Sequence, residues 1–292
     1  MPRNISFKIP IEYNNKKVVH FLRGSAQLSV RLINALKRCE DGIMLNDTHA
    51  RTIDLLSVGD TLTVNIPDDK VLPEPICMPL DIVYEDNDII AVNKSPFLAM
   101  HPTHNHQGNT LANAMAWHLK QKGVSTAFRA IGRLDKGTSG VVICALNKYA
   151  AARLTGNIQK TYIAIVQGVF EGEGTIDQPI CRPDPMKTLR ACGEQGDRAV
   201  THWQSLGTGD GRSLLRIRLE TGRTHQIRVH FAHIGAPLCG DSMYGGTGFS
   251  HQLLHCESAE FIHPVTGHPL KITAPLPWEM IKTAQNIPPI VV

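Results

Sequence analysis

One carboxylate in the sequence lies where it could carry chemistry. Asp135 falls in the stretch AIGRLDKGTSGVVICAL (130–146), on a turn rich in Gly, Thr and Ser that leads into an apolar strand. Arg133 and Lys136 flank it, and a carboxylate between two cations stays ionised at neutral pH, as a nucleophile or a base requires. The alternative is an exposed ion pair on a solvated turn, which contributes at most about 1 kcal/mol.

A second group of polar residues lies in TGRTHQIRVH (221–230), where a turn joins a strand to a predicted helix. Arg223 precedes that helix, and a guanidinium there could clamp a carboxylate or a phosphate with two parallel hydrogen bonds. The N-terminus of the helix also attracts anions. An amphipathic helix with Ile227 on its core face is the alternative. It explains the apolar residues but not the polar first turn.

Histidine clusters raise the question of a metal site. They occur in HPTHNH (His101, His104 and His106) and in HFAH (His230 and His233). Neither has cysteine or carboxylate ligands at metal-binding spacing, and the motif HExxH is absent. The glycine-rich stretch GGTGFS (245–250) lacks the Lys-Ser/Thr of a phosphate-binding loop. We therefore predict neither a metal nor a cofactor.

Composition points to a globular protein with a polyanionic partner. The chain has 292 residues and a net charge of +4, but residues 120–230 hold 17 Lys and Arg against 9 Asp and Glu. Such an excess of positive charge is typical of a protein that binds phosphates. The seven cysteines form no CxxC pair, and the N-terminus lacks an apolar signal-peptide core. We therefore expect a cytoplasmic protein.

The order of predicted elements divides the chain. Residues 1–67 form a small α+β domain, in which LSVRLINALKR (28–38) is a one-faced helix and VGDTLTVNIP (58–67) an alternating strand. The helix carries Arg31, Lys37 and Arg38, which favour RNA binding; an ordinary cap domain with solvated charges is the alternative. Residues 68–79 form a Pro-rich linker, which predicts few contacts shared between the domains.

A second, larger domain is predicted at 80–286, with a tail at 287–292. Its strands outnumber its helices and do not alternate regularly with them, so we expect an α+β fold with a largely antiparallel mixed sheet flanked by helices. One predicted helix, TLANAMAWHLKQKG (110–123), begins after Thr110 and ends at Gly123. Tyr162 lies in the alternating strand QKTYIAI (159–165), where a buried ring is the default expectation.

Several stretches together resemble the RluA-type pseudouridine synthases, a family of RNA uridine isomerases. GRLDKGTSG (132–140) is similar to the family's RLD-x-x-TSG signature, and QKTYIAIVQG (159–168) to its K-x-Y strand. TGRTHQIRVHFAHIGAPLCGDSMYG (221–245) follows its longest motif, while AVNKSPFLAMHP (91–102) and LLHCESAEFIHPVTG (253–267) resemble its NK…HP and closing segments. The resemblance covers about residues 80–276, in the family's order. Residues 1–67 are more weakly similar to an RNA-binding domain named after a ribosomal small-subunit protein.

The resemblance implies a function and a set of roles. The enzyme would flip a uridine out of a structured RNA, cleave its glycosidic bond and rejoin the uracil through C5. Asp135 would be the catalytic residue, and Arg133 would fill the space that the flipped base leaves. Arg223 would pair with Asp135, while Tyr162 and Ile227 would contact the uracil. We expect this protein to be a monomer that needs no cofactor. The family acts most often on ribosomal RNA and next on transfer RNA.

The sequence departs from the family pattern at two places, and two alternative functions remain open at this point. Gly132 stands where the family usually has His, and Ser95-Pro96-Phe97 replaces its Pro-x-Gly. A non-catalytic RNA-binding or ribosome-assembly factor on the same fold would predict loss of Asp135 or Arg223, yet both are present. A glycoside hydrolase would normally need a second carboxylate.

Overall fold

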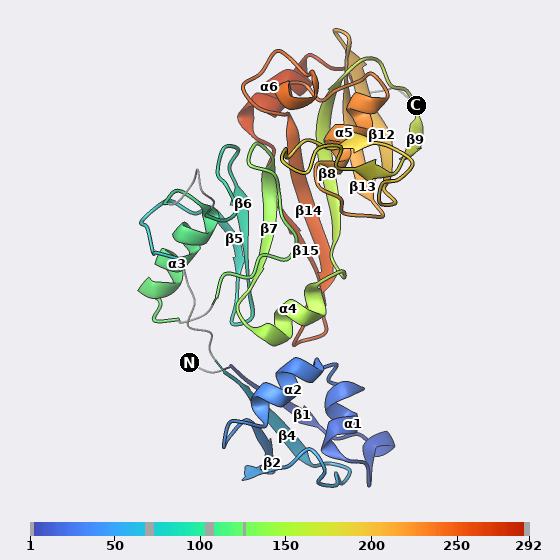
Figure 1. Ribbon diagram of the computed structural model, residues 1–292. Helices are drawn as coiled ribbons and strands as arrows, with labels where there is room; N and C mark the ends of the chain where they lie inside the picture. The colour runs from blue at the N-terminus through green and yellow to red at the C-terminus, as the bar shows by residue number, and fades with distance from the viewer. Residues whose placement is uncertain (1–2, 68–72, 103–107, 125–126, 289–292) are drawn as a thin grey trace.

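The computed structural model describes residues 3–67, 73–102, 108–124 and 127–288. It contains a small N-terminal module and a larger module built on one long sheet (Figure 1). The sheet of the larger module is mixed and mostly antiparallel, with helices and loops around it, which confirms the predicted α+β class. In the described part of the chain, no helix is both long enough and apolar enough to span a bilayer.

The N-terminal module is a four-stranded antiparallel sheet, in the order β1-β4-β2-β3, covered by two short helices. Its elements are β1 (Arg3–Lys8), α1 (Val18–Arg23), α2 (Val30–Leu36), β2 (Ile43–Leu45), β3 (Thr48–His49) and β4 (Thr61–Ile66). The predicted alternation in β4 is confirmed, because Leu62, Val64 and Ile66 are buried. The Ser29 side chain caps α2 by accepting a hydrogen bond from the amide of Leu32. Strand β1 was not predicted.

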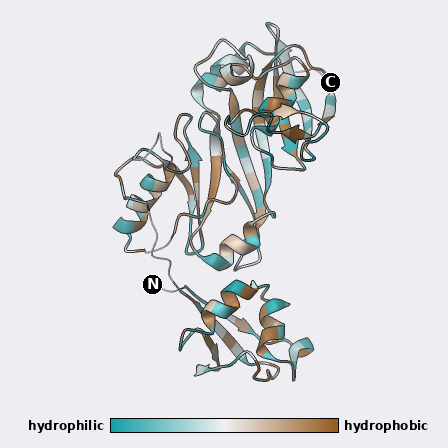
Figure 2. Cartoon of the chain, viewed as in Figure 1, coloured by the Kyte–Doolittle hydropathy of each residue, from teal (hydrophilic) through white to brown (hydrophobic). Residues whose placement is uncertain are grey.

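The strands of the larger module follow one another in the order β5-β6-β7-β14-β8-β13-β12-β9, with β15 paired to β14. They are β5 (Ile82–Glu85), β6 (Ile89–Lys94), β7 (Ser139–Ala145), β8 (Gln159–Gln167), β9 (Glu173–Asp177), β12 (Val200–Gly209), β13 (Arg212–Leu219), β14 (Leu254–Ile262) and β15 (Pro269–Thr273). A separate hairpin joins β10 (Ile180–Cys181) to β11 (Ala191–Cys192). Hydrophobic residues run along the central strands (Figure 2).

The helices of this module are α3 (Leu111–Gln121), α4 (Lys148–Leu154), α5 (Gln226–His233) and α6 (Trp278–Gln285). As predicted, Thr110 caps α3, and its side chain and that of Asn113 form a capping box. Strand β14 is the last long strand in sequence, yet it lies between β7 and β8. It pairs with β7 in parallel and with β8 in the antiparallel sense.

The structure differs from the prediction at the end of the linker and at the start of the tail. Residues 68–72 of the linker lie outside the described part of the chain. The next residues, without regular secondary structure, pack on α3: the amide of Ile76 donates to the carbonyl of Asn113, whose side chain donates to the carbonyl of Glu74. Ile287, the predicted start of the tail, is buried in a small core cluster with Ile163 and Ile165. The folded core therefore extends beyond residue 286.

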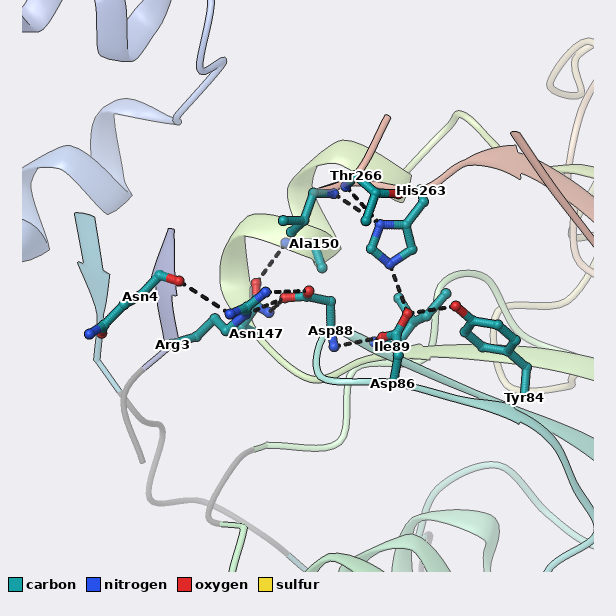
Figure 3. A network of polar contacts seen from close by, with 11 residues as sticks. Arg3, Asn4, Tyr84, Asp86, Asp88, Ile89, Asn147, Ala150, His263 and Thr266 are labelled. Atoms are coloured by element: carbon teal, nitrogen blue, oxygen red, sulfur yellow. Dashed lines mark hydrogen bonds and ion pairs between the residues drawn. The ribbon is translucent and has the colours of Figure 1, made fainter. Parts of the chain in front are cut away.

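The two modules share specific contacts, which corrects the expectation of few. The Arg3 guanidinium donates two hydrogen bonds to the buried Asp88 carboxylate, both 2.8 Å, and Asn147 donates a third (Figure 3). The Tyr149 ring, from α4, is buried in the core of the N-terminal module. Arg153 reaches from the same helix to the carbonyl of Ala26. The prolines restrict the backbone of the linker only, so the two modules can still contact each other through other residues.

Candidate active site

The turn that carries Asp135 lies at the start of β7, the strand that the sequence places after it. The amide of Thr138 donates to the carbonyl of Asp135, closing the turn. Gly132, which stands where the related family usually has His, takes a φ of 75°, a conformation that suits glycine. The turn is held from the other side by Gln252, whose amide donates to the Thr138 hydroxyl. Asp135 is thereby fixed in place and partly exposed.

Arg228 binds the Asp135 carboxylate directly. Its Nη1 donates to Asp135 Oδ2 at 2.9 Å, while its Nε and Nη2 donate to the two oxygens of the buried Asp241 at 2.7 and 2.8 Å. Burial would lower the pKa of Arg228, but the hydrogen bonds and charges of Asp241 and Asp135 outweigh burial and raise it. One permanent cation therefore orients Asp135, and Asp241 fixes that cation.

The prediction that Arg223 pairs with Asp135 is wrong. The Arg223 Nη1 lies 3.2 Å from Asp197 Oδ2, and its Nε donates to the carbonyl of Arg198. The reason is the position at which helix α5 begins. His225 takes a left-handed φ of 59° and ends the turn, so the helix starts at Gln226 and its first turn directs Arg228, not Arg223, toward Asp135.

All five residues that the sequence singled out nevertheless line one cavity. A space of about 60 Å³ is lined by Arg133, Asp135, Tyr162, Arg223 and Ile227, among others. It shares Asp135, Tyr162 and Arg223 with a wider cleft of about 430 Å³. Arg133 is exposed, whereas Tyr162 and Ile227 are buried. The site therefore has an apolar floor, an acid beside it and cations around its opening.

Tyr162 forms part of that floor. It belongs to β8, whose residues Thr161 to Val166 are all buried, and 8% of its surface is exposed. Burial, together with the nearby Cys256 and Asp135, raises the pKa of its phenol well above the ordinary value. The hydroxyl therefore stays protonated at neutral pH, so Tyr162 offers a ring face and a hydrogen-bond donor rather than a base.

Residues 88–233 match the model of a family described as RNA pseudouridylate synthase. The chain belongs to the RNA pseudouridine synthase family. It is 36% identical over 271 residues to the Bacillus subtilis protein named uncharacterized RNA pseudouridine synthase YjbO, covering 89% of this chain and 95% of that one. Ribosomal large subunit pseudouridine synthase D of Haemophilus influenzae is 36% identical over 266 residues, covering 78% of this chain and 82% of that one.

A solved structure is similar as well. Human RNA pseudouridylate synthase domain containing 1 superposes with a TM-score of 0.58 at 26% identity, covering 73% of this chain and 90% of that one. The expected membership and activity are thus confirmed: this pseudouridine synthase is an isomerase that acts on RNA. The alternative of a non-catalytic assembly factor is not supported.

Several residues of this pseudouridine synthase site were missed by sequence reasoning. Arg228, His225 and Asp241 all lie inside the long motif at 221–245, which signalled the site without assigning their roles. His225 Nε2 lies 3.8 Å from Asp135 Oδ2, and its Nδ1 lies 2.8 Å from the Tyr244 hydroxyl. Burial lowers the pKa of His225, although the charge of Asp135 opposes this. A neutral His225 therefore stands beside the carboxylate.

Lys94 was also missed, although it belongs to the quoted NK segment. Its ammonium is buried and donates to the carbonyls of Ser95, Leu98 and Lys136. Burial lowers the pKa of Lys94 to about 7, an effect that the charge of Asp135 opposes. The side chain ties the segment after β6 to the turn that carries the catalytic-site acid.

The histidine clusters and one acidic group are the candidate metal ligands of this chain. His104 and His106 lie outside the described residues. His230 is buried and bonded to Thr201 and to the carbonyl of Gln178. Elsewhere among the described residues, Asp86, Asp88 and His263 lie close enough to hold an ion. Arg3 and Asn147 already bind Asp88, and His263 lies 2.9 Å from Asp86, so a cation would have to displace these partners.

Proposed function

We propose that this enzyme converts specific uridines of large-subunit ribosomal RNA to pseudouridine, with Asp135 as the catalytic residue. The observation that carries the proposal is the ion pair between Asp135 and Arg228 at the edge of a cleft with an apolar floor. A relative at 36% identity is named ribosomal large subunit pseudouridine synthase D, which supports the choice of RNA.

The cleft accounts for the need to flip the base. A uridine within a helix cannot present its glycosidic bond to a carboxylate recessed in a cleft, so the nucleotide must leave its stack. In this proposal the exposed Arg133 fills the vacated space, and Tyr162 and Ile227, which line the same cavity, contact the uracil ring. Asp135 then acts on the ribose or the base while N1–C1′ breaks and C5–C1′ forms.

Arginine side chains beside the cleft provide contacts for the RNA backbone. A neighbouring cavity of about 730 Å³ is lined by Arg182, Arg190 and Arg223, and it shares Arg223 with the cleft. In the N-terminal module, Arg31, Lys37 and Arg38 are exposed on and just after α2. We propose that both surfaces bind phosphates, Arg223 among them as a substrate contact.

The folded unit that we propose is one chain acting alone in the cytoplasm, with a small RNA-binding domain ahead of the catalytic one. The seven cysteines, all within the described residues, are free, as is typical of a reducing compartment.

Replacing Asp135 with Asn tests the catalytic assignment. Asn keeps the shape and the hydrogen-bonding capacity of the side chain but is a far poorer nucleophile and base. We expect tritium release from RNA labelled at uridine C5 to fall below detection, while RNA binding and the unfolding temperature change little, because Arg228 keeps Asp241 as a partner.

Glu260→Gln is the matched control, since Glu260 is a partly exposed carboxylate paired with Lys271 and does not line the cleft. It should keep its activity. Tritium release at the wild-type rate in Asp135→Asn would refute the catalytic assignment. Mapping of pseudouridines in total RNA, with and without the gene, tests the substrate: changes confined to transfer RNA would refute the ribosomal proposal.

A further inference from the structure

Phe97 has a backbone conformation that its side chain disfavours. Its φ is 69°, in the left-handed region where bulky residues are rare because Cβ crowds the backbone. Folding usually offsets such strain by burying the side chain, but 52% of the surface of Phe97 is exposed. Strain at an exposed aromatic residue, with little burial to compensate it, is typical of residues held in place for a function.

Phe97 lies in the loop that the buried Lys94 joins to the catalytic turn. The Lys94 ammonium donates to the carbonyl of Leu98, next to Phe97, at 2.9 Å. It donates to the carbonyl of Lys136, next to Asp135, at 3.1 Å. One ammonium therefore holds the segment that carries Phe97 against the turn that carries Asp135.

The Phe97 side chain packs against the ring of His251. The two rings meet edge to face, with their centroids 5.0 Å apart and their planes at 89°. His251 is itself buried and lies 3.0 Å from Glu279, so it is a firm support. The adjacent Gln252 braces the catalytic turn through Thr138. The ring thus packs against His251 while about half of the residue stays open to solvent.

We propose that Phe97 stacks on an unpaired base of the RNA next to the target uridine. This inference rests on the proposed function. Flipping a nucleotide leaves neighbouring bases unstacked, and a rigid aromatic face recovers stacking with any of them. The exposed Arg133 and Lys136 on the adjacent turn favour a nucleic acid as the partner of this surface, because they attract its phosphates.

Three variants separate stacking from a structural role. Phe97→Gly removes the ring and the strain together, so it should raise the unfolding temperature while raising the KM for RNA and the Kd by about 5- to 150-fold. The single-turnover rate at saturating RNA should stay within about twofold, because Asp135 is untouched. Phe97→Asn tolerates the same φ without a ring and should weaken binding equally. Phe97→Tyr should bind as the wild type does.

Asp210→Gly is the matched control, because Asp210 also has a positive φ, 52°, in the β12–β13 turn. It should raise the unfolding temperature and leave the KM unchanged. A normal KM in Phe97→Gly and Phe97→Asn would overturn the proposal, as would an equally raised KM in Phe97→Tyr. Failure of the proposed function is distinguishable, because the wild-type enzyme would then leave the uridines of the ribosomal RNA unmodified.

Discussion

Arg228 binds two carboxylates at once, and this double contact fixes the position of Asp135. It holds Asp135 through Nη1 while Asp241 holds its other two nitrogens. Lys could keep the charge but not the three-point contact. We therefore expect Arg228→Lys to lower kcat by about 100-fold or more, with little change in the KM for RNA.

Arg223→Lys is the companion experiment. Arg223 binds the exposed Asp197 and not Asp135, so its replacement should raise the KM and leave kcat nearly unchanged. Steady-state tritium release with both variants gives the comparison. The opposite pattern, a loss of kcat in Arg223→Lys alone, would contradict the assignment of Arg228 as the positioning residue.

The difference between these two arginines shows how much of the site can be predicted from the sequence at the scale of single residues. The motif at 221–230 located both residues, because polar types in a turn before a helix are visible in sequence. Which arginine meets Asp135 depends on the rotation of α5, and this depends on the left-handed conformation of His225. The His225 side chain also contacts Tyr244, 19 residues further along the chain, and such a non-local contact is not visible in the motif.

At the scale of elements, the contact between β7 and β14 places the catalytic turn. Gly140 pairs with Cys256 at this contact, with a φ of 106°, and a Cβ there would lie 2.2 Å from the Cys256 carbonyl oxygen. We expect Gly140→Ala to lower the free energy of unfolding by more than about 3 kcal/mol, because backbone must move to admit the methyl group. Activity should fall with it.

The matched control is Gly211→Ala. Gly211 also has a positive φ, 67°, but no atom lies within 4 Å of the position that a Cβ would take. Strain alone should then cost about 1–2 kcal/mol. Urea unfolding of the two variants gives the comparison, and equal losses would show that the approach of β14 is not what makes Gly140 necessary.

Local signals predicted some elements and not others. Helix α3 was predicted from Thr110 and a helical repeat, since its cap and its face lie within one segment of sequence. Strand β1 was missed because its local pattern is weak: in and next to it, only Ile5 and Ile9 are buried. It forms a strand by pairing with β4, more than 50 residues later in the sequence. The place of β14 between β7 and β8 is likewise a property of non-local pairing.

At the scale of the whole molecule, the Arg3–Asp88 pair couples the two modules (Figure 3). Arg3→Ala leaves a buried carboxylate without its cation, which destabilises the docked arrangement. We expect calorimetry to show two unfolding transitions in this variant where the wild type shows one. Arg51→Ala, which removes an exposed pair with Asp54, should unfold as the wild type does. A single unshifted transition in Arg3→Ala would show that the pair does not couple the modules.

Buried histidines predict how stability depends on pH. Burial lowers the pKa of His225, His230 and His255 from 6.5 in the folded protein. The unfolded chain therefore binds protons more tightly, so unfolding takes up protons and the free energy of unfolding falls as the pH drops below about 6.5. The loss should level off once the pH is below the folded pKa values.

Urea unfolding between pH 7.5 and pH 5 measures this dependence. His255→Asn removes one titrating group, bonded to Ser139 and to the carbonyl of Ala274, and should make the stability less sensitive to acid. His268→Asn is the control, because His268 is exposed. Identical pH dependence in the wild type and His255→Asn would rule out this histidine as a contributor.

The position of β14 also has a consequence for the order of events during synthesis. Until Leu254–Ile262 has emerged from the ribosome, β7 and β8 have no strand between them, and Gln252 cannot brace the catalytic turn. Pairings this far apart in sequence form late in folding. The nascent chain therefore carries Asp135 for more than a hundred residues of translation without an assembled site. Activity toward RNA should therefore begin only after β14 has been synthesised.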